Sequence, residues 1–222
     1  MTQETPFSLL PADFVAALFG QARTVALARN QALFRAGDPC DGCYRIVEGL
    51  LKVTAAAPSR RERILAIVGP GALVGELSMI DGAPRSAAVT AIRDSRLSFV
   101  TRAAFEAFAQ ANPEVYRQIS ALLARHLRDN NNALVATSFL SVKGRAARAL
   151  LSLADAFGEN VGSGRILIHQ KVSQADLAAM AGIARENLSR ILQEWMRNGV
   201  IKRLASYYCV ENKAALEREA DD

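Results

Sequence analysis

The sequence holds few of the residues from which metal and redox sites are built. Its 222 residues include three cysteines and two histidines. An odd number of cysteines does not form a disulfide framework. Cys40 and Cys43 have the C-x-x-C spacing of half a zinc site, but a strong zinc signal needs a second such pair. We therefore expect no metal, and the role of these two cysteines is left open.

Membrane-spanning and catalytic patterns are also missing. The apolar residues 64–74 are interrupted by Gly69-Pro70-Gly71, so the run is too short to cross a bilayer. Residues 1–4 lack the basic start and apolar core of a signal peptide. No paired-carboxylate, Ser–His or P-loop pattern supports catalysis. These absences predict a cytoplasmic protein with no membrane partner and no enzymatic activity.

The composition is that of a folded protein. Hydrophobic residues make up 50% of the chain and charged residues 22%, which excludes a disordered chain. The formal net charge of +5 permits a nucleic-acid partner but does not establish one. The length suits one large domain or two ordinary ones.

Short apolar runs, each followed by turn residues, fill the segment between Ala26 and Val100. Gly37, Gly49 and Gly82 fall at turns, where a residue that tolerates positive φ is often needed. Several short strands at this spacing predict an antiparallel barrel or sandwich. The expected strands cover residues 44–47, 51–54, 64–68, 86–92 and 97–100. A short amphipathic helix over residues 9–18 precedes them.

A largely helical half follows the strands. Thr101 is the expected N-cap of a helix over residues 103–109, and a long helix is expected from Glu114 to about Leu140. Apolar residues form a stripe along the long helix: Ile119, Leu122, Leu123, Leu127, Leu134 and Phe139. With little else to bury it, this stripe indicates a partner helix, most simply the same helix of a second subunit. His126 is expected at the seam or at the edge of a pocket.

Residues 74–89 combine a carboxylate, a turn, a proline, an arginine and very small side chains between two apolar ends that are predicted to be strands. Arg85 can meet two phosphate oxygens at once through its guanidinium fork. Because Ser86 and Ala87 are short, their backbone N–H groups can turn inward as an anion-binding nest. Glu76 can accept a hydrogen bond from a sugar hydroxyl. The stretch therefore suits a small phosphodiester, and a plain β-hairpin is the alternative.

A second group of motifs occupies residues 173–192. Ser173 and Asp176 are close to a capping box, and Gly182 marks a tight turn before a second helix. Helix, glycine-containing turn and helix form the helix-turn-helix arrangement, whose second helix enters the major groove of DNA. The outer face of that second helix carries Arg185, Glu186, Ser189 and Arg190.

The outer face of the second helix has the chemistry to read bases. An arginine there can donate hydrogen bonds to both O6 and N7 of guanine, and a glutamate can accept a hydrogen bond from N4 of cytosine. Ser173 and Gln174 are predicted to meet backbone phosphates. Residues 200–203 and 207–210 predict a β-hairpin wing. The alternative is a helical hairpin with a solvated charged face.

Two of these motifs resemble those of a known family. Gly75-Glu76-Leu77, followed nine residues after the glutamate by Arg85, is similar to the phosphate-binding cassette of cyclic-nucleotide-binding domains. Arg185-Glu186, followed by Arg190, is similar to the recognition-helix pattern of the same family. The whole chain resembles the cyclic-AMP receptor protein (catabolite activator) and fumarate-nitrate regulator family of bacterial transcription regulators.

The resemblance implies an α+β fold with three parts. These are an N-terminal antiparallel β-roll that binds cyclic nucleotide (residues 1–112), a dimerisation helix (113–140) and a C-terminal winged helix-turn-helix domain (141–222), with a hinge over residues 141–145. It implies that the nucleotide contacts Gly75, Glu76, Leu77, Arg85, Ser86 and Ala87. Asn130 and Asn131 stand where the family's base-contacting hydroxyl residues usually stand. A register-fixing polar layer of a coiled coil is their other interpretation.

The implied function is sequence-specific transcription regulation by a cytoplasmic homodimer. Its effector would be cyclic AMP, or alternatively cyclic GMP, with no cofactor, and its partners would be an operator in double-stranded DNA and RNA polymerase. The iron–sulfur cluster of the oxygen-sensing branch would need four cysteines. Two alternatives remain: a regulator of the same fold that responds to another signal or to none, and a nucleotide-binding module that acts on a protein partner.

Overall fold

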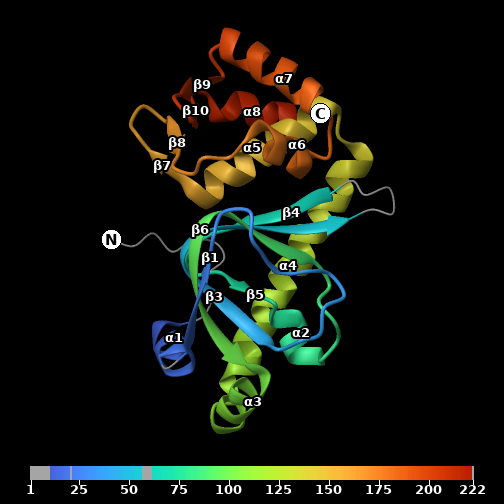
Figure 1. Ribbon diagram of the computed structural model, residues 1–222. Coiled ribbons are helices and arrows are strands. Elements are labelled where there is room, and N and C mark those ends of the chain that lie inside the picture. The colour runs from blue at the N-terminus through green and yellow to red at the C-terminus, as the bar shows by residue number, and fades with distance from the viewer. Residues whose placement is uncertain (1–10, 21, 57–61, 222) are drawn as a thin grey trace. The chain divides into compact units, whose positions relative to one another are not determined.

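The computed structural model describes residues 11–20, 22–56 and 62–221 (Figure 1). The chain splits into two compact units, Met1–Arg61 with Leu65–Asp129 and Glu62–Ile64 with Asn130–Asp222. We call them the N-terminal and the C-terminal unit. Within the described residues, no helix is both long enough and apolar enough to cross a membrane.

The N-terminal half of the chain forms an antiparallel sheet, as predicted. Within the described residues the strand order is β1-β6-β3-β4, with β2 paired to β6 and β5 paired to β3. The strands are β1 (Arg23–Leu27), β2 (Ala32–Phe34), β3 (Gly42–Ala56), β4 (Glu62–Val68), β5 (Leu73–Val74) and β6 (Ala88–Thr101).

Two pairs of predicted strands are in fact single long strands. β3 contains residues 44–47 and 51–54, and β6 contains most of residues 86–92 and all of 97–100. The register of the two strands shifts around Gly49, which has φ +112°. There Ser95 Oγ accepts a hydrogen bond from Leu50 N (3.2 Å) and donates one to Arg93 O (2.7 Å). A β-bulge therefore stands where the glycine predicted a turn.

Helices cover this sheet and close its core. They are α1 (Ala12–Phe19), α2 (Glu76–Asp81), α3 (Arg102–Ala111) and α4 (Glu114–Phe139). Phe105 of α3 and Ile119 of α4 pack with Cys43 and Val100 of the sheet in one buried cluster. Thr101 caps α3 by accepting a hydrogen bond from Ala104 N, which confirms the predicted cap. The first residues of the helix predicted over 9–18 lie outside the described residues.

The structure confirms the two predicted strand ends of residues 74–89, which belong to β5 and β6, and excludes the alternative of a plain β-hairpin. The strand ends at Val74, and α2 follows it in place of a hairpin arm. Gly75 (φ +83°) and Gly82 (φ +73°) lie at the two ends of α2 in the left-handed conformation, and Gly82 N donates to Ser78 O at 2.9 Å. Each end of α2 is therefore marked by a glycine whose backbone departs from the strand conformation. The helix is too short for a helical repeat of apolar residues to be recognised in the sequence.

The C-terminal unit is a winged helix-turn-helix. Its elements are α5 (Val142–Phe157), β7 (Gly158–Asn160), β8 (Ile166–Ile168), α6 (Gln174–Ala181), α7 (Arg185–Arg197), β9 (Ile201–Leu204), β10 (Tyr207–Val210) and α8 (Lys213–Asp221). Within the described residues β7-β8-β10-β9 form one sheet, and β9 with β10 is the predicted wing.

One helix of this unit begins within the predicted hinge. Residues 142–145, expected as part of a hinge, are the first turn of α5, because the Ser141 side chain accepts a hydrogen bond from Gly144 N and starts the helix there. Residues 158–160 pair with β8 as strand β7. The sequence of these three residues does not have a strand pattern, so they form a strand only because they pair with β8.

Candidate functional site

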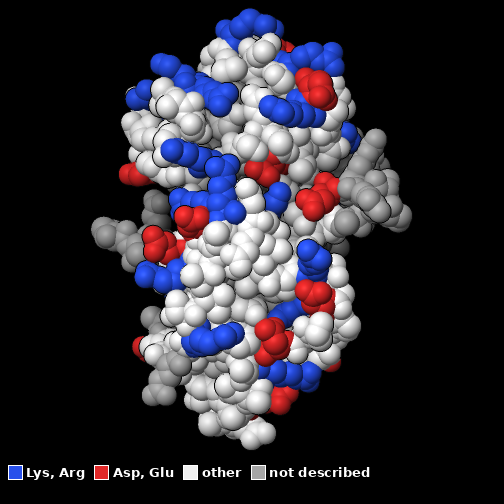
Figure 2. Space-filling view, in the orientation of Figure 1, with Lys and Arg blue, Asp and Glu red and all other residues white. Residues whose placement is uncertain are grey.

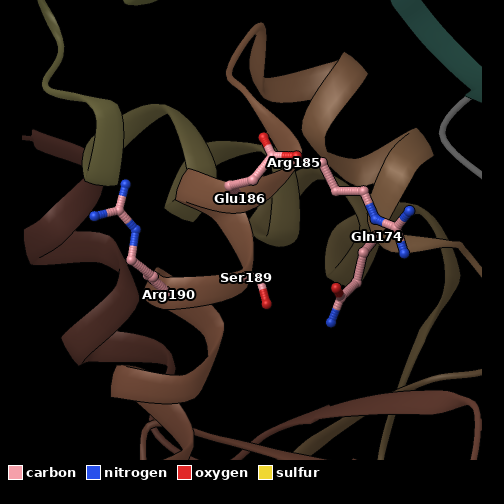
Figure 3. Close-up of a pocket in the computed structure, with 5 residues that line it drawn as sticks. All are labelled: Gln174, Arg185, Glu186, Ser189 and Arg190. Atoms are coloured by element: carbon pink, nitrogen blue, oxygen red, sulfur yellow. The ribbon is translucent and has the colours of Figure 1, made fainter.

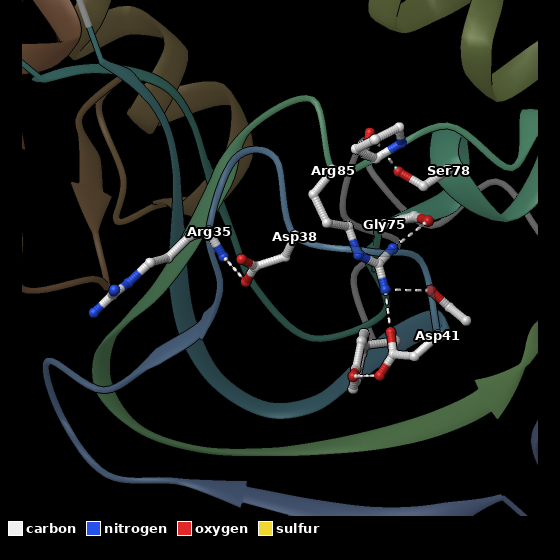
Figure 4. A network of polar contacts seen from close by, with 9 residues as sticks. Arg35, Asp38, Asp41, Gly75, Ser78 and Arg85 are labelled. Atoms are coloured by element: carbon white, nitrogen blue, oxygen red, sulfur yellow. Dashed lines mark hydrogen bonds and ion pairs between the residues drawn. The ribbon is translucent and has the colours of Figure 1, made fainter.

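Arg85, the predicted phosphate ligand, is buried and held by protein acceptors (Figure 4). Only 3% of its surface is exposed. Its Nη1 donates to Gly75 O at 2.9 Å and its Nη2 to Gly42 O at 2.7 Å. Nη2 also forms an ion pair with Asp41 Oδ1. Arg85 thus connects the start of β3 with the start of α2.

Two aromatic rings complete the surroundings of Arg85. Its Cζ lies 4.4 Å from the ring centroid of Phe34 and 5.9 Å from that of Tyr44. Tyr44 OH donates to Asp41 Oδ2 at 2.7 Å, and the pKa of Tyr44 is raised by burial and by this hydrogen bond. Ring faces and a carboxylate stabilise a buried guanidinium. We call Phe34, Asp41, Gly42, Tyr44 and Gly75 the Arg85 site.

The Arg85 guanidinium keeps donor capacity for an anion. Of its five N–H groups, three are used by the acceptors of the Arg85 site. Its buried Nε makes no hydrogen bond within the described part of the chain. A buried donor without a partner is costly, so an anion at this position would be stabilised.

Glu76, the predicted sugar-hydroxyl acceptor, is also buried, with 8% of its side chain exposed. His126 Nδ1, from α4, lies 3.3 Å from Glu76 Oε1. Burial raises the pKa of the neighbouring Cys43 thiol to about 12, and the charge of Glu76 contributes to this rise. His126 is therefore half-buried beside Glu76, and its place at the edge of a ligand pocket stays a prediction.

The remaining predicted nucleotide ligands are less enclosed. Leu77 and Ser86 are exposed, and Ala87 is half-buried. Asn130 and Asn131 lie on α4 with exposed side chains, in the C-terminal unit. Their contact with a nucleotide stays a prediction. Within the described residues, no group of three or more His, Cys, Asp or Glu side chains could hold a metal ion.

Gly75 is a position of the Arg85 site that leaves no room for a side chain. It has φ +83°, and a Cβ added there would overlap Arg85 Nη1. Gly75→Ala is expected to weaken nucleotide binding roughly tenfold or more, because it displaces the guanidinium from its acceptors. Gly37→Ala is the matched control: Gly37 has φ +89° with open space around its Cβ position, and alanine keeps its N–H. Calorimetric titration of both variants checks this, and equal affinities would contradict it.

The sequence did not reveal the partners of Arg85. Asp41 and Gly42 lie 44 and 43 residues before it. Pairing of β3 with β5 places Gly75 near them, and backbone hydrogen bonds from Gly37 N to Arg85 O and from Arg85 N to Asp38 O hold Arg85 beside the same loop. In the sequence, Phe34 and Tyr44 look like ordinary core residues of alternating strands, so nothing in the pattern marks them as neighbours of an arginine. A carboxylate directly before a strand is a weak signal, since most such residues are solvated turn residues.

The helix-turn-helix is built by the local signals that predicted it. Ser173 caps α6: its Oγ accepts from Asp176 N (3.0 Å) and donates to Asp176 Oδ2 (2.6 Å). Gly182 ends α6 with φ +64°. Buried Leu188 and Trp195 fix α7 on the unit's core. The outer face of α7 is thereby held toward solvent.

Five of the six predicted DNA-binding residues line one surface concavity (Figure 3): Gln174, Arg185, Glu186, Ser189 and Arg190. Gln174 comes from the start of α6 and the others from α7. The sixth, Ser173, uses its hydroxyl in the cap of α6. Arg190 Nη2 donates to Asn187 Oδ1. In Figure 2, Lys and Arg side chains lie around the surface where Figure 1 shows α7, with a smaller acidic area between them.

The far end of α7 is anchored by one lysine. Lys143 Nζ, in the first turn of α5, lies 2.8 Å from Glu194 Oε1 of α7 and 2.7 Å from Glu219 Oε1 of α8. Hydrogen bonds to Glu194 and Glu219 raise the pKa of Lys143. Three helices therefore meet at this side chain, which helps to set the direction of α7.

Comparison with known proteins identifies both domains of the chain. Residues 24–112 match the model of the cyclic nucleotide-binding domain, and residues 144–219 match that of the Crp-like helix-turn-helix domain. The chain is 34% identical over 206 residues to a CRP-like cAMP-activated global transcriptional regulator of Mycobacterium tuberculosis, covering 93% of this chain and 92% of the relative.

Two further similarities cover most of the chain. The cyclic AMP receptor protein of Thermus thermophilus is 32% identical over 86% of this chain and 85% of its own. The structure of FixK2 from Bradyrhizobium japonicum superimposes with a TM-score of 0.80 over 89% of this chain and 96% of its own, at 22% identity, which supports the fold.

Proposed function

The chain belongs to the CRP/FNR family of transcription regulators, and we propose that it is a homodimer that binds operator DNA when cyclic AMP is bound. One observation supports the proposal most strongly. The same chain contains a buried arginine with an unused hydrogen-bond donor and a helix-turn-helix whose second helix has two exposed arginines. Cytoplasmic location and contact with RNA polymerase belong to the same proposal.

In the proposed complex each part of the nucleotide meets a different group. The cyclic phosphodiester takes the unused donors of Arg85, and the ribose hydroxyl donates to the Glu76 carboxylate. The base meets Asn130 and Asn131, whose amides carry donors and an acceptor and can serve adenine or guanine. Cyclic AMP is preferred over cyclic GMP because the relatives at 34% and 32% identity are named for cyclic AMP.

DNA binding is proposed to use α7 in the major groove, with Gln174 at a backbone phosphate. In a dimer, two such helices read adjacent major grooves when they are about 34 Å apart. Cyclic AMP can favour that spacing only by binding the DNA-competent state more tightly than the other.

The proposed dimer contact is the C-terminal part of the apolar stripe of α4, because Ile119 and Leu122 at its start are buried in the core of their own unit. Leu127, Leu134 and Phe139 are 61%, 67% and 80% exposed. Leu134→Asp is expected to weaken dimerisation at least roughly tenfold, because a carboxylate in an apolar contact loses its hydration. Asn132→Asp adds the same charge to an exposed position of the same helix and is expected to leave the dimer intact. Sedimentation velocity measures both, and a dimeric Leu134→Asp variant would exclude this contact.

The function is tested by titrating the nucleotide-free protein with cyclic AMP and cyclic GMP, and then measuring DNA affinity with and without each. Tight binding of cyclic AMP and nucleotide-dependent DNA affinity are the expected results. DNA binding without any nucleotide effect would favour a regulator of another signal. Nucleotide binding with no DNA binding would favour a module that acts on a protein partner.

A further inference from the structure

Glu76 is a buried carboxylate whose partner comes from another element. Burial of a carboxylate is costly unless a cation or a donor compensates it. Within the described residues, the ion pair that the structure gives Glu76 is with His126 Nδ1, at 3.3 Å. The nearby Cys43 thiol is kept neutral by burial, since burial raises its pKa, and so adds no second negative charge.

The chemistry of the pair fixes the direction of donation. An ionised carboxylate only accepts hydrogen bonds, so a hydrogen bond across this 3.3 Å contact would be donated by the Nδ1–H of His126. With Oε1 held in this way, the lone pairs of the other carboxylate oxygen are available to a ligand hydroxyl. The imidazole therefore orients the group that meets the sugar.

We propose that His126 is a positioning residue that holds the Glu76 carboxylate for the 2′-hydroxyl of the ribose. This inference rests on the proposed function, because it concerns the same nucleotide. His126 does not need to touch the ligand; it acts on ribose recognition through Glu76.

Because His126 lies on α4, it also couples ribose binding at Glu76 to the position of that helix. Leu122, one turn before His126, is buried in the N-terminal unit's core, while Leu127, the next residue, belongs to the exposed stripe. A ligand hydroxyl that strengthens the Glu76–His126 contact would stabilise the orientation of α4 in which the two groups meet. Loss of the contact should therefore weaken the nucleotide's effect on DNA binding as well as its affinity.

The test is a thermodynamic cycle between the side chain and one ligand atom. Cyclic AMP and 2′-deoxy cyclic AMP are titrated calorimetrically into wild type, His126→Asn and His126→Leu. Asparagine places an amide N–H near the position of Nδ1, and leucine has a similar shape without a donor. Thermal unfolding of each variant shows whether it is folded at the titration temperature.

The expected result depends on the ligand. His126→Leu should lose roughly tenfold in affinity for cyclic AMP and less than about twofold for the deoxy analogue, since a hydrogen bond to a charged group is worth about that factor. His126→Asn should retain most of the wild-type preference for the 2′-hydroxyl. Glu76→Gln should lose that preference in the presence of His126.

Other outcomes overturn the inference in distinguishable ways. Equal losses for both ligands in His126→Leu would show that His126 does not act through the 2′-hydroxyl, while the proposed function would stand. Unchanged affinity of His126→Leu for cyclic AMP would exclude the positioning role in the same way. Failure of wild type to bind cyclic AMP would overturn the proposed function, and this inference with it.

Discussion

Arg85→Ala is expected to abolish the response to cyclic nucleotide and to lower the affinity for cyclic AMP roughly a hundredfold or more. The buried guanidinium would supply two charge-assisted hydrogen bonds to the phosphodiester, and each is worth about 1.5–3 kcal/mol. Its neighbours in the Arg85 site are carbonyls, aromatic rings and a carboxylate, so none of them could replace its charge. Calorimetric titration measures the loss.

The same substitution is also expected to destabilise the fold. The structure uses the Arg85 guanidinium to satisfy the carbonyls of Gly42 and Gly75. Loss of their shared donor should lower the free energy of unfolding by about 1–3 kcal/mol. Asp41, with 55% of its side chain exposed, can be hydrated and should add little.

Two further variants separate charge, geometry and stability. Arg85→Lys keeps the positive charge but loses the planar guanidinium with its several N–H donors. It should therefore bind nucleotide more weakly than wild type and more tightly than Arg85→Ala. Arg35→Ala removes an exposed arginine whose side chain points away from Arg85 in Figure 4, and it should bind normally. Near-normal nucleotide affinity in folded Arg85→Ala would exclude the pocket assignment.

Local signals in the sequence predicted the parts of the molecule that local interactions build. The cap by Ser173, the left-handed Gly182 and the wing each depend on a few neighbouring residues, and the structure confirms them. The recognition-helix face was predictable for the same reason. Its buried side chains recur at helical spacing, which leaves Arg185 and Arg190 outside.

Features that depend on distant partners were missed. The helix α2 is too short to show a period, and β3 runs through Gly49 because Ser95 of another strand replaces the missing ladder bonds. The burial of Arg85 was equally hidden, since its acceptors are supplied by strand pairing and by the left-handed turn at Gly75. The sequence pattern indicates what a side chain can do chemically more readily than it indicates which residues surround that side chain in the fold.

Arg185→Ala is expected to reduce discrimination between operator and random DNA by about 1–3 kcal/mol, which is a factor of roughly five to 150. Arg185 is exposed in the first turn of α7 and makes no hydrogen bond or ion pair within the described part of the chain. Its fork is therefore available for guanine O6 and N7. Arg190 differs, because its Nη2 already donates to Asn187.

The control must remove the same charge from the same helix. Arg197 lies exposed in the last turn of α7, outside the concavity, so Arg197→Ala should leave discrimination unchanged. Both variants are measured by competition between a selected operator and random duplex at several salt concentrations with cyclic AMP present. Equal weakening of Arg185→Ala on both DNAs, with a shallower salt dependence, would make Arg185 a phosphate contact. Specificity would then have to come from Glu186 and Arg190, the other charged side chains of the concavity.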